Sequence, residues 1–353
     1  MTLRGHDYDD HERFDRPRRH TRPRTKDRPS YDDAIEAMIV TVDRGRFTCL
    51  VAGEAAQPDQ VVTAMKSRPL GRKGVVVGDR VRLVGDVTGR DGTLARIVEV
   101  VERRTVLRRT ADDDDPVERV IVANADQLVV VAALANPEPR PRLIDRALVA
   151  AYDAGLDPLL CLTKPDLADP ETLLSTYRPL GVPHVVTERG EDPFEVRQRL
   201  AGRISVLVGH SGVGKSTLVN ALVPGAERAI GHVNATTGRG RHTSTSVLML
   251  RLPPPDGAPD DTPAERTGGV SEGWIVDTPG IRSFGLAHVE PRRLIVAFPD
   301  LAALTAECSR GCTHGEQEPE CALDAAIEGG DTERARVDSF RRLLASRERG
   351  DLD

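Results

Sequence analysis

The chain has 353 residues, of which 39% are hydrophobic and 29% charged, and its formal net charge at pH 7 is −6. This length allows two or three domains of about 100–200 residues each. No apolar run approaches the roughly 18 residues of a membrane-spanning helix, and the N-terminus lacks the apolar core of a secretory signal. The five cysteines, three of which cluster with a histidine, argue against a disulfide framework. We therefore expect a cytoplasmic protein without a membrane partner.

Residues 1–33 form a predicted basic arm. The first 30 residues carry nine basic and six acidic side chains, three histidines and almost no aliphatic residues. A segment of this composition cannot bury a core, so we expect it to be disordered. Two roles are open for it, which are contact with the phosphates of an RNA and simple solubilisation of the chain.

Residues 34–110 alternate between short apolar runs and turn residues, which predicts a small all-β domain. Five short strands in this length are typical of a Greek-key barrel of the OB type, a fold that commonly binds RNA. The expected strands are Ala37–Val42, Phe47–Val51, Val61–Met65, Arg80–Val84 and Leu94–Val100.

The charge of this predicted barrel also suits an RNA partner. Twelve basic and five acidic side chains lie between Lys66 and Arg109, and neutralisation of phosphates drives most of the affinity for RNA. Phe47 is the one aromatic residue of the segment, which favours contacts with the shape and backbone of folded RNA over base stacking. A solvated basic face without a partner is the alternative.

An α/β domain is predicted for residues 111–290, after the acidic run Asp112–Asp115, which is typical of a solvated linker. Its first chemical motif, Thr163-Lys164-Pro165-Asp166, follows the strand-like run Pro158–Leu162 and is similar to Asn-Lys-x-Asp, the guanine selector of GTPases. The Asp166 carboxylate can accept two hydrogen bonds from guanine that adenine cannot offer, and the stem of Lys164 can pack across the base. Thr163 stands where Asn is usual, so one contact to the base is altered. The alternative is an ordinary strand-to-turn junction.

The second motif is a phosphate-binding loop. It follows the apolar run Ile204–Val208, precedes the helical pattern Thr217–Leu222, and matches G-x-x-x-x-G-K-[ST]. Its glycines let consecutive N–H groups point at phosphates, and the helix N-terminus favours negative charge. Lys215 would reach the outer phosphates and the Ser216 hydroxyl would bind Mg²⁺. The expected nucleotide-binding residues are Gly209, His210, Ser211, Gly212, Val213, Gly214, Lys215, Ser216 and Thr217.

The third motif, Asp277-Thr278-Pro279-Gly280, follows the strand-like Trp274–Val276. Asp277 would supply a carboxylate to the Mg²⁺ shell, and Gly280 an N–H to the γ-phosphate. Ile281 occupies the position at which Ras-like enzymes have a water-orienting Gln, so slow intrinsic turnover is expected. The irregular stretch Pro253–Gly269 before it is predicted to be a flexible hairpin insertion with no evident chemistry.

Residues 291–353 contain a predicted zinc site, Cys308-x₃-Cys312-x-His314-x₆-Cys321. Three thiolates and one imidazole close a tetrahedral shell around one Zn²⁺ and leave no position open, which indicates a structural ion. Free buried cysteines with a surface histidine are the alternative. An amphipathic helix is expected at Val337–Leu344, and its flanking arginines suit contact with RNA or a protein.

The guanine selector precedes the phosphate loop, which reverses the usual order and predicts a circularly permuted domain. With this order, the chain resembles the RsgA type of circularly permuted GTPase, which acts in maturation of the small ribosomal subunit. The resemblance extends to Val122–Val131 at the start of the domain, to the helix at Leu143–Leu148 and to the switch I segment at Gly240–Thr245. It covers about residues 34 to 345, judged by motif order.

This resemblance implies a fold, cofactors and partners. The expected fold is a permuted α/β P-loop GTPase domain, preceded by an all-β OB-type barrel and followed by a small α-helical zinc-binding domain. The expected cofactors are GTP, Mg²⁺ and one structural Zn²⁺, and the expected partners are the 30S subunit and its 16S rRNA, bound by a monomer. The family usually has one more residue between its first two cysteines, so the zinc geometry departs from the family pattern.

Hydrolysis would need a water-orienting group in place of the missing Gln. His242, in the switch I-like segment, is the candidate that would act with Lys215, and Thr243, Ser244 or Thr245 would complete the Mg²⁺ shell. A surface histidine in a mobile loop is the alternative for His242. We expect GTP to serve as a timer for docking on the immature subunit and leaving it. A signalling GTPase without RNA and a non-catalytic RNA-binding scaffold are the two other hypotheses.

Overall fold

The computed structural model describes residues 31–53, 58–71, 74–110, 118–226, 247–253, 273–278, 284–286 and 288–348. The described residues from Asp33 onward belong to one compact unit. Several sequence predictions fall outside the described residues. These are the arm up to residue 30, the run Asp112–Asp115, His242 and Thr243 with the rest of Gly240–Thr245, the stretch Pro279–Ile281 with Gly280, and the insertion beyond Pro253.

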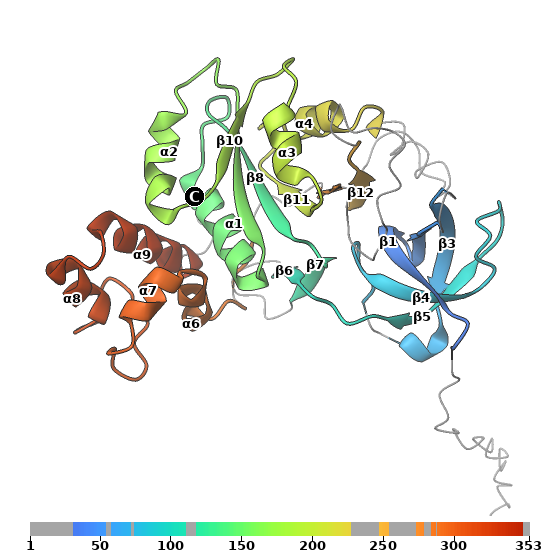
Figure 1. The fold of residues 1–353 in the computed structure, drawn as a ribbon, viewed down its shortest axis with the longest axis horizontal. Helices are drawn as coiled ribbons and strands as arrows, with labels where there is room; N and C mark the ends of the chain where they lie inside the picture. The colour runs from blue at the N-terminus through green and yellow to red at the C-terminus, as the bar shows by residue number, and fades with distance from the viewer. Residues whose placement is uncertain are drawn as a thin grey trace, which may run out of the picture. The chain divides into compact units, whose positions relative to one another are not determined.

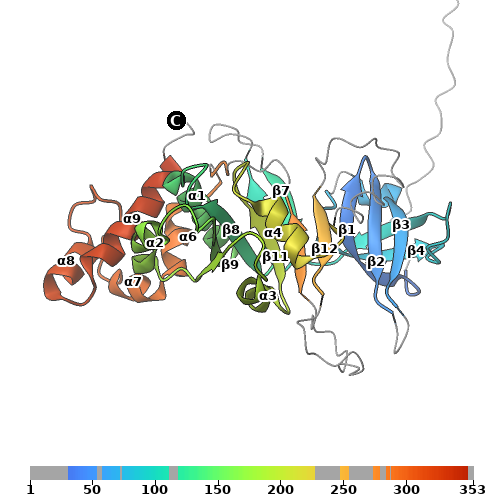
Figure 2. The same ribbon diagram turned by 90° about the horizontal axis from the view of Figure 1, so that it is seen from above.

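The first domain is the predicted five-stranded barrel (Figures 1 and 2). Its strands pair in the order β1-β2-β3-β5-β4, and β4 pairs again with β1, which closes the barrel. β3 and β5 are parallel and the other pairs antiparallel, as a Greek key requires. Alternate side chains, among them Ile39, Cys49, Val62, Val81 and Ile97, are completely buried and fill the interior. The strands are β1 (Ile35–Asp43), β2 (Arg46–Val51), β3 (Gln60–Lys66), β4 (Arg80–Gly85) and β5 (Ala95–Val100), with a 3₁₀ turn η1 (Arg68–Leu70) after β3.

A two-stranded sheet follows the barrel. β6 (Val106–Arg109) pairs with β7 (Arg119–Ala123) in antiparallel fashion rather than with a barrel strand. The chain therefore leaves the barrel after β5, and β6 and β7 lead it into the α/β domain.

The α/β domain contributes six strands, in the order β10-β9-β8-β11-β13-β12, to a sheet that continues into the barrel, because β12 also pairs with β1 where Leu248 lies opposite Thr41. All neighbours are parallel except β12, which runs antiparallel to β13. Every residue of β8 and of β11 is buried, which explains why both strands read as continuous apolar runs. The strands are β8 (Gln127–Ala133), β9 (Asp157–Thr163), β10 (His184–Thr187), β11 (Ile204–Val208), β12 (Leu248–Arg251) and β13 (Trp274–Asp277).

Helices cover both faces of this sheet, and the alternation along β8 shows which helix lies where. Leu128 and Val130 belong to the core shared with α1 (Pro141–Ala154). Val129 and Val131 face the other way, into the core shared with α3 and α4. The remaining helices are α2 (Glu171–Tyr177), η2 (Arg178–Leu180), α3 (Phe194–Leu200) and α4 (Lys215–Leu222).

The C-terminal domain is a small group of helices, drawn in orange and red in Figure 1. Phe298 is buried in its core, and its ring meets Tyr152 of α1 and Phe340 edge-on at centroid distances of 4.9 and 5.3 Å. Among the described helices, none combines the length and apolar character needed to cross a membrane. The helices are α6 (Pro291–Leu294), η3 (Ile295–Ala297), α7 (Pro299–Leu304), α8 (Ala322–Gly329) and α9 (Arg334–Glu348), of which α9 is longer than the predicted Val337–Leu344.

Candidate nucleotide and zinc sites

The phosphate loop connects the end of β11 to the start of α4, as the motif predicted. Gly212 and Gly214 have φ values of 84° and 92°, a left-handed conformation that favours glycine. A Cβ on Gly209 would lie 2.6 Å from the carbonyl oxygen of Val131 on β8, so no larger residue fits there. The glycines of the motif are therefore explained by the backbone path that wraps the loop over the sheet.

Lys215 and Asp277 lie together at the carboxyl edge of the sheet. The Lys215 Nζ donates to the Asp277 carboxylate, and their side chains are only 13% and 18% exposed. The buried Thr278 hydroxyl donates to the Leu207 carbonyl at 2.7 Å, which holds the end of β13 against β11. Two residues separated by 62 positions in sequence are thus placed where phosphates and a cation would meet, with the exposed Ser216 beside them at the start of α4.

The predicted guanine-selector loop, Thr163–Asp166, follows β9 at the same edge. The Thr163 hydroxyl is buried and donates to the Val213 carbonyl of the phosphate loop at 2.6 Å. The Lys164 Nζ donates to the Gly212 carbonyl at 3.0 Å and also to the carbonyl of Asn136. Asp166 is exposed and free to meet a base. Sequence reasoning considered Thr163 only as an altered base contact, whereas in the structure its hydroxyl bonds the phosphate loop.

This bond predicts the effect of replacing Thr163. We expect Thr163→Val to weaken binding of GDP and GTP by about 10-fold, because an unsatisfied buried carbonyl costs about 1–3 kcal/mol. Thr163→Ser keeps the hydroxyl and serves as the matched control, with affinity within about 2-fold of the original. Equilibrium titration with a fluorescent guanine nucleotide measures both. Equal affinities for the valine and serine variants would contradict the role of the Thr163 hydroxyl.

The predicted zinc ligands come together in the C-terminal domain. The ligand atoms of Cys308, Cys312, His314 and Cys321 all lie within 4.8 Å of one another. The His314 Nδ1 is 3.5, 3.5 and 3.8 Å from the three Sγ atoms in chain order. Sulfur and nitrogen ligands of a tetrahedral Zn²⁺ lie about 3.6 Å apart, so the four residues fit this ion. The shorter spacing between the first two cysteines does not prevent the convergence.

Backbone and side-chain contacts orient these ligands. The Ala322 N–H at the start of α8 donates to the Cys308 Sγ at 3.3 Å, and the His314 N–H donates to the Cys312 Sγ at 3.4 Å. Arg341 of α9 donates to the His314 carbonyl at 3.2 Å. Burial raises the pKa of the Cys312 thiol to about 11, and a bound cation would reverse this effect by stabilising the thiolate. The site thus links the loop that carries its ligands, residues 308–321 (the knuckle), to α8 and α9.

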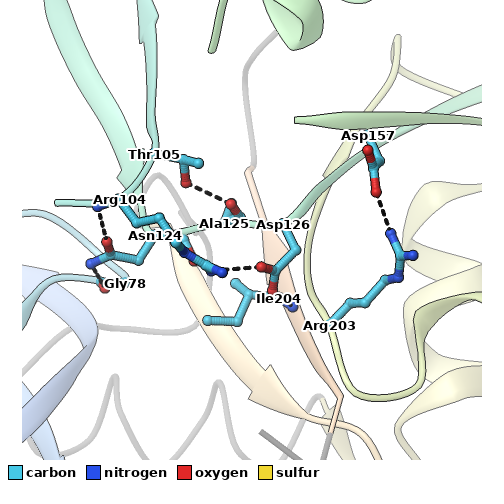
Figure 3. Close-up of polar contacts among 9 residues, drawn as sticks. All are labelled: Gly78, Arg104, Thr105, Asn124, Ala125, Asp126, Asp157, Arg203 and Ile204. Atoms are coloured by element: carbon cyan, nitrogen blue, oxygen red, sulfur yellow. Dashed lines mark hydrogen bonds and ion pairs between the residues drawn. The ribbon is translucent and has the colours of Figure 1, made fainter. Parts of the chain in front are cut away.

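A set of polar contacts that the sequence did not predict joins the barrel to the sheet (Figure 3). The buried Asn124, with φ 55°, donates to the Gly78 carbonyl at 2.9 Å and accepts from the Arg104 N–H at 2.8 Å. The Asp126 carboxylate accepts from the Arg104 guanidinium at 2.6 Å and from the Ile204 N–H at 2.8 Å. Asn124 and Asp126 therefore connect the barrel and the residues after β5 to the first residue of β11, the strand that carries the phosphate loop.

The first and second motifs and the described residues of the third, Asp277 and Thr278, thus meet at one edge of the parallel strands although they are scattered over more than one hundred positions of the sequence. The fold and this site define a P-loop GTPase domain with permuted chain order. The sequence model of the RsgA GTPase family matches residues 100–287. The chain belongs to the RsgA GTPase family, as the motif order predicted.

Individual relatives agree with this assignment. A protein of Ectopseudomonas mendocina named small ribosomal subunit biogenesis GTPase RsgA is 42% identical over 235 residues, which is 64% of this chain and 63% of the relative. The alignment thus spans less than two thirds of that relative. A protein of the same name from Pseudomonas fluorescens SBW25 is 40% identical over 259 residues, 71% of this chain and 69% of the relative.

Two crystal structures share the fold. YjeQ from Thermotoga maritima superimposes with a TM-score of 0.62 at 25% identity, over 89% of this chain and 99% of its own. YloQ, described as a circularly permuted GTPase, gives a TM-score of 0.60 at 24% identity, over 89% of this chain and 95% of its own. The predicted permuted fold is therefore confirmed.

Proposed function

We propose that this protein hydrolyses GTP to GDP and phosphate and acts in late maturation of the small ribosomal subunit. The observation that carries the proposal is the meeting of Lys215, Asp277 and the loop Thr163–Asp166 at one edge of the sheet. The curated relatives named above are small-subunit biogenesis GTPases, which supports the 30S subunit and its 16S rRNA as partners. We further propose that the protein acts as a monomer in the cytoplasm.

Each residue of the site has a part in this mechanism. The loop amides and Lys215 would bind the outer phosphates of GTP, while Asp166 would accept hydrogen bonds from guanine. Ser216 and Asp277 offer the hard oxygen ligands that Mg²⁺ prefers, together with Thr243 and the phosphates. Bound Mg²⁺ neutralises the charge that develops on the phosphates. Because Ile281 cannot orient water, His242 is proposed to do so when docking orders its segment, and hydrolysis to GDP then favours release.

The barrel supplies cations for the proposed RNA contact, but ion pairs within the barrel leave fewer of them available than the sequence suggests. Arg80 and Arg82 are paired with Glu36 and Glu99 at 3.3 and 3.7 Å, and Arg103 with the buried Asp79 at 2.7 Å. A charge held in such a pair is less available to a phosphate. Among the described barrel residues, the exposed arginines outside these pairs are Arg44, Arg46, Arg68, Arg90 and Arg96, and these are the proposed RNA-facing cations.

The experiment that tests the function is GTP hydrolysis by the purified protein, alone and with purified small ribosomal subunits. We expect slow turnover alone and stimulation by about 10²-fold or more with the subunit, because docking would place the proposed water-orienting His242 at the γ-phosphate. ATP is the control and should be used poorly in both conditions. Absence of stimulation, or equal use of ATP, would contradict the proposal. With stimulation observed, His242→Ala should remove most of it while leaving nucleotide affinity unchanged.

A further inference from the structure

Arg146 of α1 is a guanidinium group buried to 2% exposure and far from the nucleotide motifs in sequence. Its Nε donates to the carbonyl of Phe284 at 2.9 Å, and a terminal nitrogen donates to the same oxygen. The other terminal nitrogen donates to the carbonyl of Ser346, near the end of α9, at 2.9 Å. Burying a charged group costs several kcal/mol unless hydrogen bonds compensate, so these bonds hold both segments firmly against α1.

Through Phe284, the contact made by Arg146 lies close in sequence to the third nucleotide motif. Phe284 is itself buried and lies four residues after Gly280 in the sequence, where the chain leaves the motif that begins at Asp277. On its other side, the Gly285 carbonyl accepts from the N–H of Thr110 at the end of β6, at 3.3 Å. Phe284 and Gly285 are thus held between Arg146 of α1 and Thr110, which follows β6.

The same face of α1 also contacts residues 288 and 293, which come after Phe284 in the sequence. Asp153 lies seven residues after Arg146, which is two helical turns along the same face. Its carboxylate is 3.3 Å from the Arg293 guanidinium and 3.8 Å from the His288 imidazole. α1 therefore contacts Phe284, His288 and Arg293, the last of which lies in α6 at the start of the C-terminal domain.

A second contact joins α1 to α9 without touching Phe284. The Nε of Arg342 donates to the buried Asp145 at 3.1 Å, and its guanidinium lies 5.2 Å from the centre of the Tyr177 ring. Arg146 and Arg342 thus both connect α1 with α9, but only Arg146 also bonds Phe284. This difference allows the two connections to be separated by experiment.

We propose that Arg146 is a positioning residue for GTP hydrolysis, which holds the chain at Phe284, six residues after Thr278 of the third motif, and couples this point to α9 of the C-terminal domain. A displacement of the motif with nucleotide state would shift the Phe284 carbonyl, and Arg146 would carry this shift to Ser346. The proposal rests on the proposed hydrolysis of GTP but not on a ribosomal partner. It is therefore tested with the protein alone.

The first test compares Arg146→Met with the matched control Arg342→Met in single-turnover GTP hydrolysis, at a temperature at which both are folded. We expect Arg146→Met to lower the hydrolysis rate by about 10-fold or more with the nucleotide dissociation constant within about 2-fold, since small misplacements of catalytic groups reduce rate more than binding. Arg342→Met should change the rate by less than about 2-fold, and Arg146→Lys should restore part of it. Equal losses in Arg146→Met and Arg342→Met would show that domain docking alone matters and would overturn the proposal.

The second test measures amide hydrogen exchange of α9 with GDP and with a non-hydrolysable GTP analogue. The full-length protein should show a nucleotide-dependent difference at the end of α9, and Arg146→Met should remove it while Arg342→Met retains it. If Arg146→Met does not fold, Arg146→Lys replaces it, and its nucleotide-dependent difference in exchange at the end of α9 should be smaller than that of the unsubstituted protein. No difference between nucleotides in the unsubstituted protein would refute the coupling. Failure of that protein to hydrolyse GTP at all would instead refute the proposed function.

Discussion

Replacing Lys215 by alanine is expected to lower the rate of GTP hydrolysis by about 10³-fold, the scale seen when one preorganised charged or hydrogen-bonding group is removed from a reacting centre. The physical reason is that Lys215 begins α4, is 13% exposed and lies against Asp277, so its charge is aimed at the proposed position of the outer phosphates. In a site with little water, such a charge stabilises the transition state more strongly than it would at the surface. Asp277→Ala should give a loss of similar size through the Mg²⁺ shell.

The measurement is single-turnover hydrolysis of radiolabelled GTP by each variant, with circular dichroism as the check on folding. Lys66→Ala is the control, because Lys66 ends β3 in the barrel and should leave hydrolysis without the subunit unchanged. A Lys215→Ala variant that retains more than half of the activity would show that the nucleotide site is structural. The hypothesis of a non-catalytic RNA-binding scaffold would then be preferred.

Removal of zinc is expected to have the largest effect on stability. We expect one Zn²⁺ per chain in the purified protein, and a C-terminal domain that is unfolded in nearly all molecules of Cys312→Ser or after treatment with a strong chelator. The reason is that the domain relies on short helices, six residues in α7 and eight in α8, with the four ligands tying α8 and α9 to the knuckle. In such small domains the free energy of metal binding supplies much of the free energy of folding.

Metal content by mass spectrometry and protease sensitivity of residues 291–348 measure this effect. Cys161→Ala is the matched control, since Cys161 is buried in β9, away from the metal ligands, and its loss should leave zinc content unchanged. Zinc-free protein with an intact C-terminal domain would contradict the structural role of the ion.

The two motif types that the sequence revealed most directly share one property. The phosphate loop and the Cys/His cluster each depend on backbone geometry or ligand spacing within about fourteen residues, so the chemistry is visible in one stretch of chain. The barrel strands were predicted to within about two residues for the same reason, because the alternation of buried and exposed side chains is a local signal. The order of the nucleotide motifs along the chain predicted the permutation, which the fold confirms.

Contacts between segments that are distant in sequence leave no such local pattern in the residues. Thr163 was considered for its effect on a base, but its hydroxyl bonds Val213, 50 positions away. Asn124 lay within a recognised segment, yet its bond to Gly78 depends on how the barrel packs against the α/β domain. Residues 106–109 lay within the predicted domain 34–110 but in none of its five predicted strands, and the structure pairs them, as β6, with β7.

By itself, the sequence determined the class of domains, the nucleotide and zinc motifs and the order in which they occur, because each depends on residues that are close along the chain. Only the tertiary structure decided which residues hold these parts to one another. Arg146 shows the distinction, because its bonds reach 138 positions to Phe284 and 200 to Ser346. Partners at such separations are chosen by the packing of whole elements, and no local pattern of residue types specifies them.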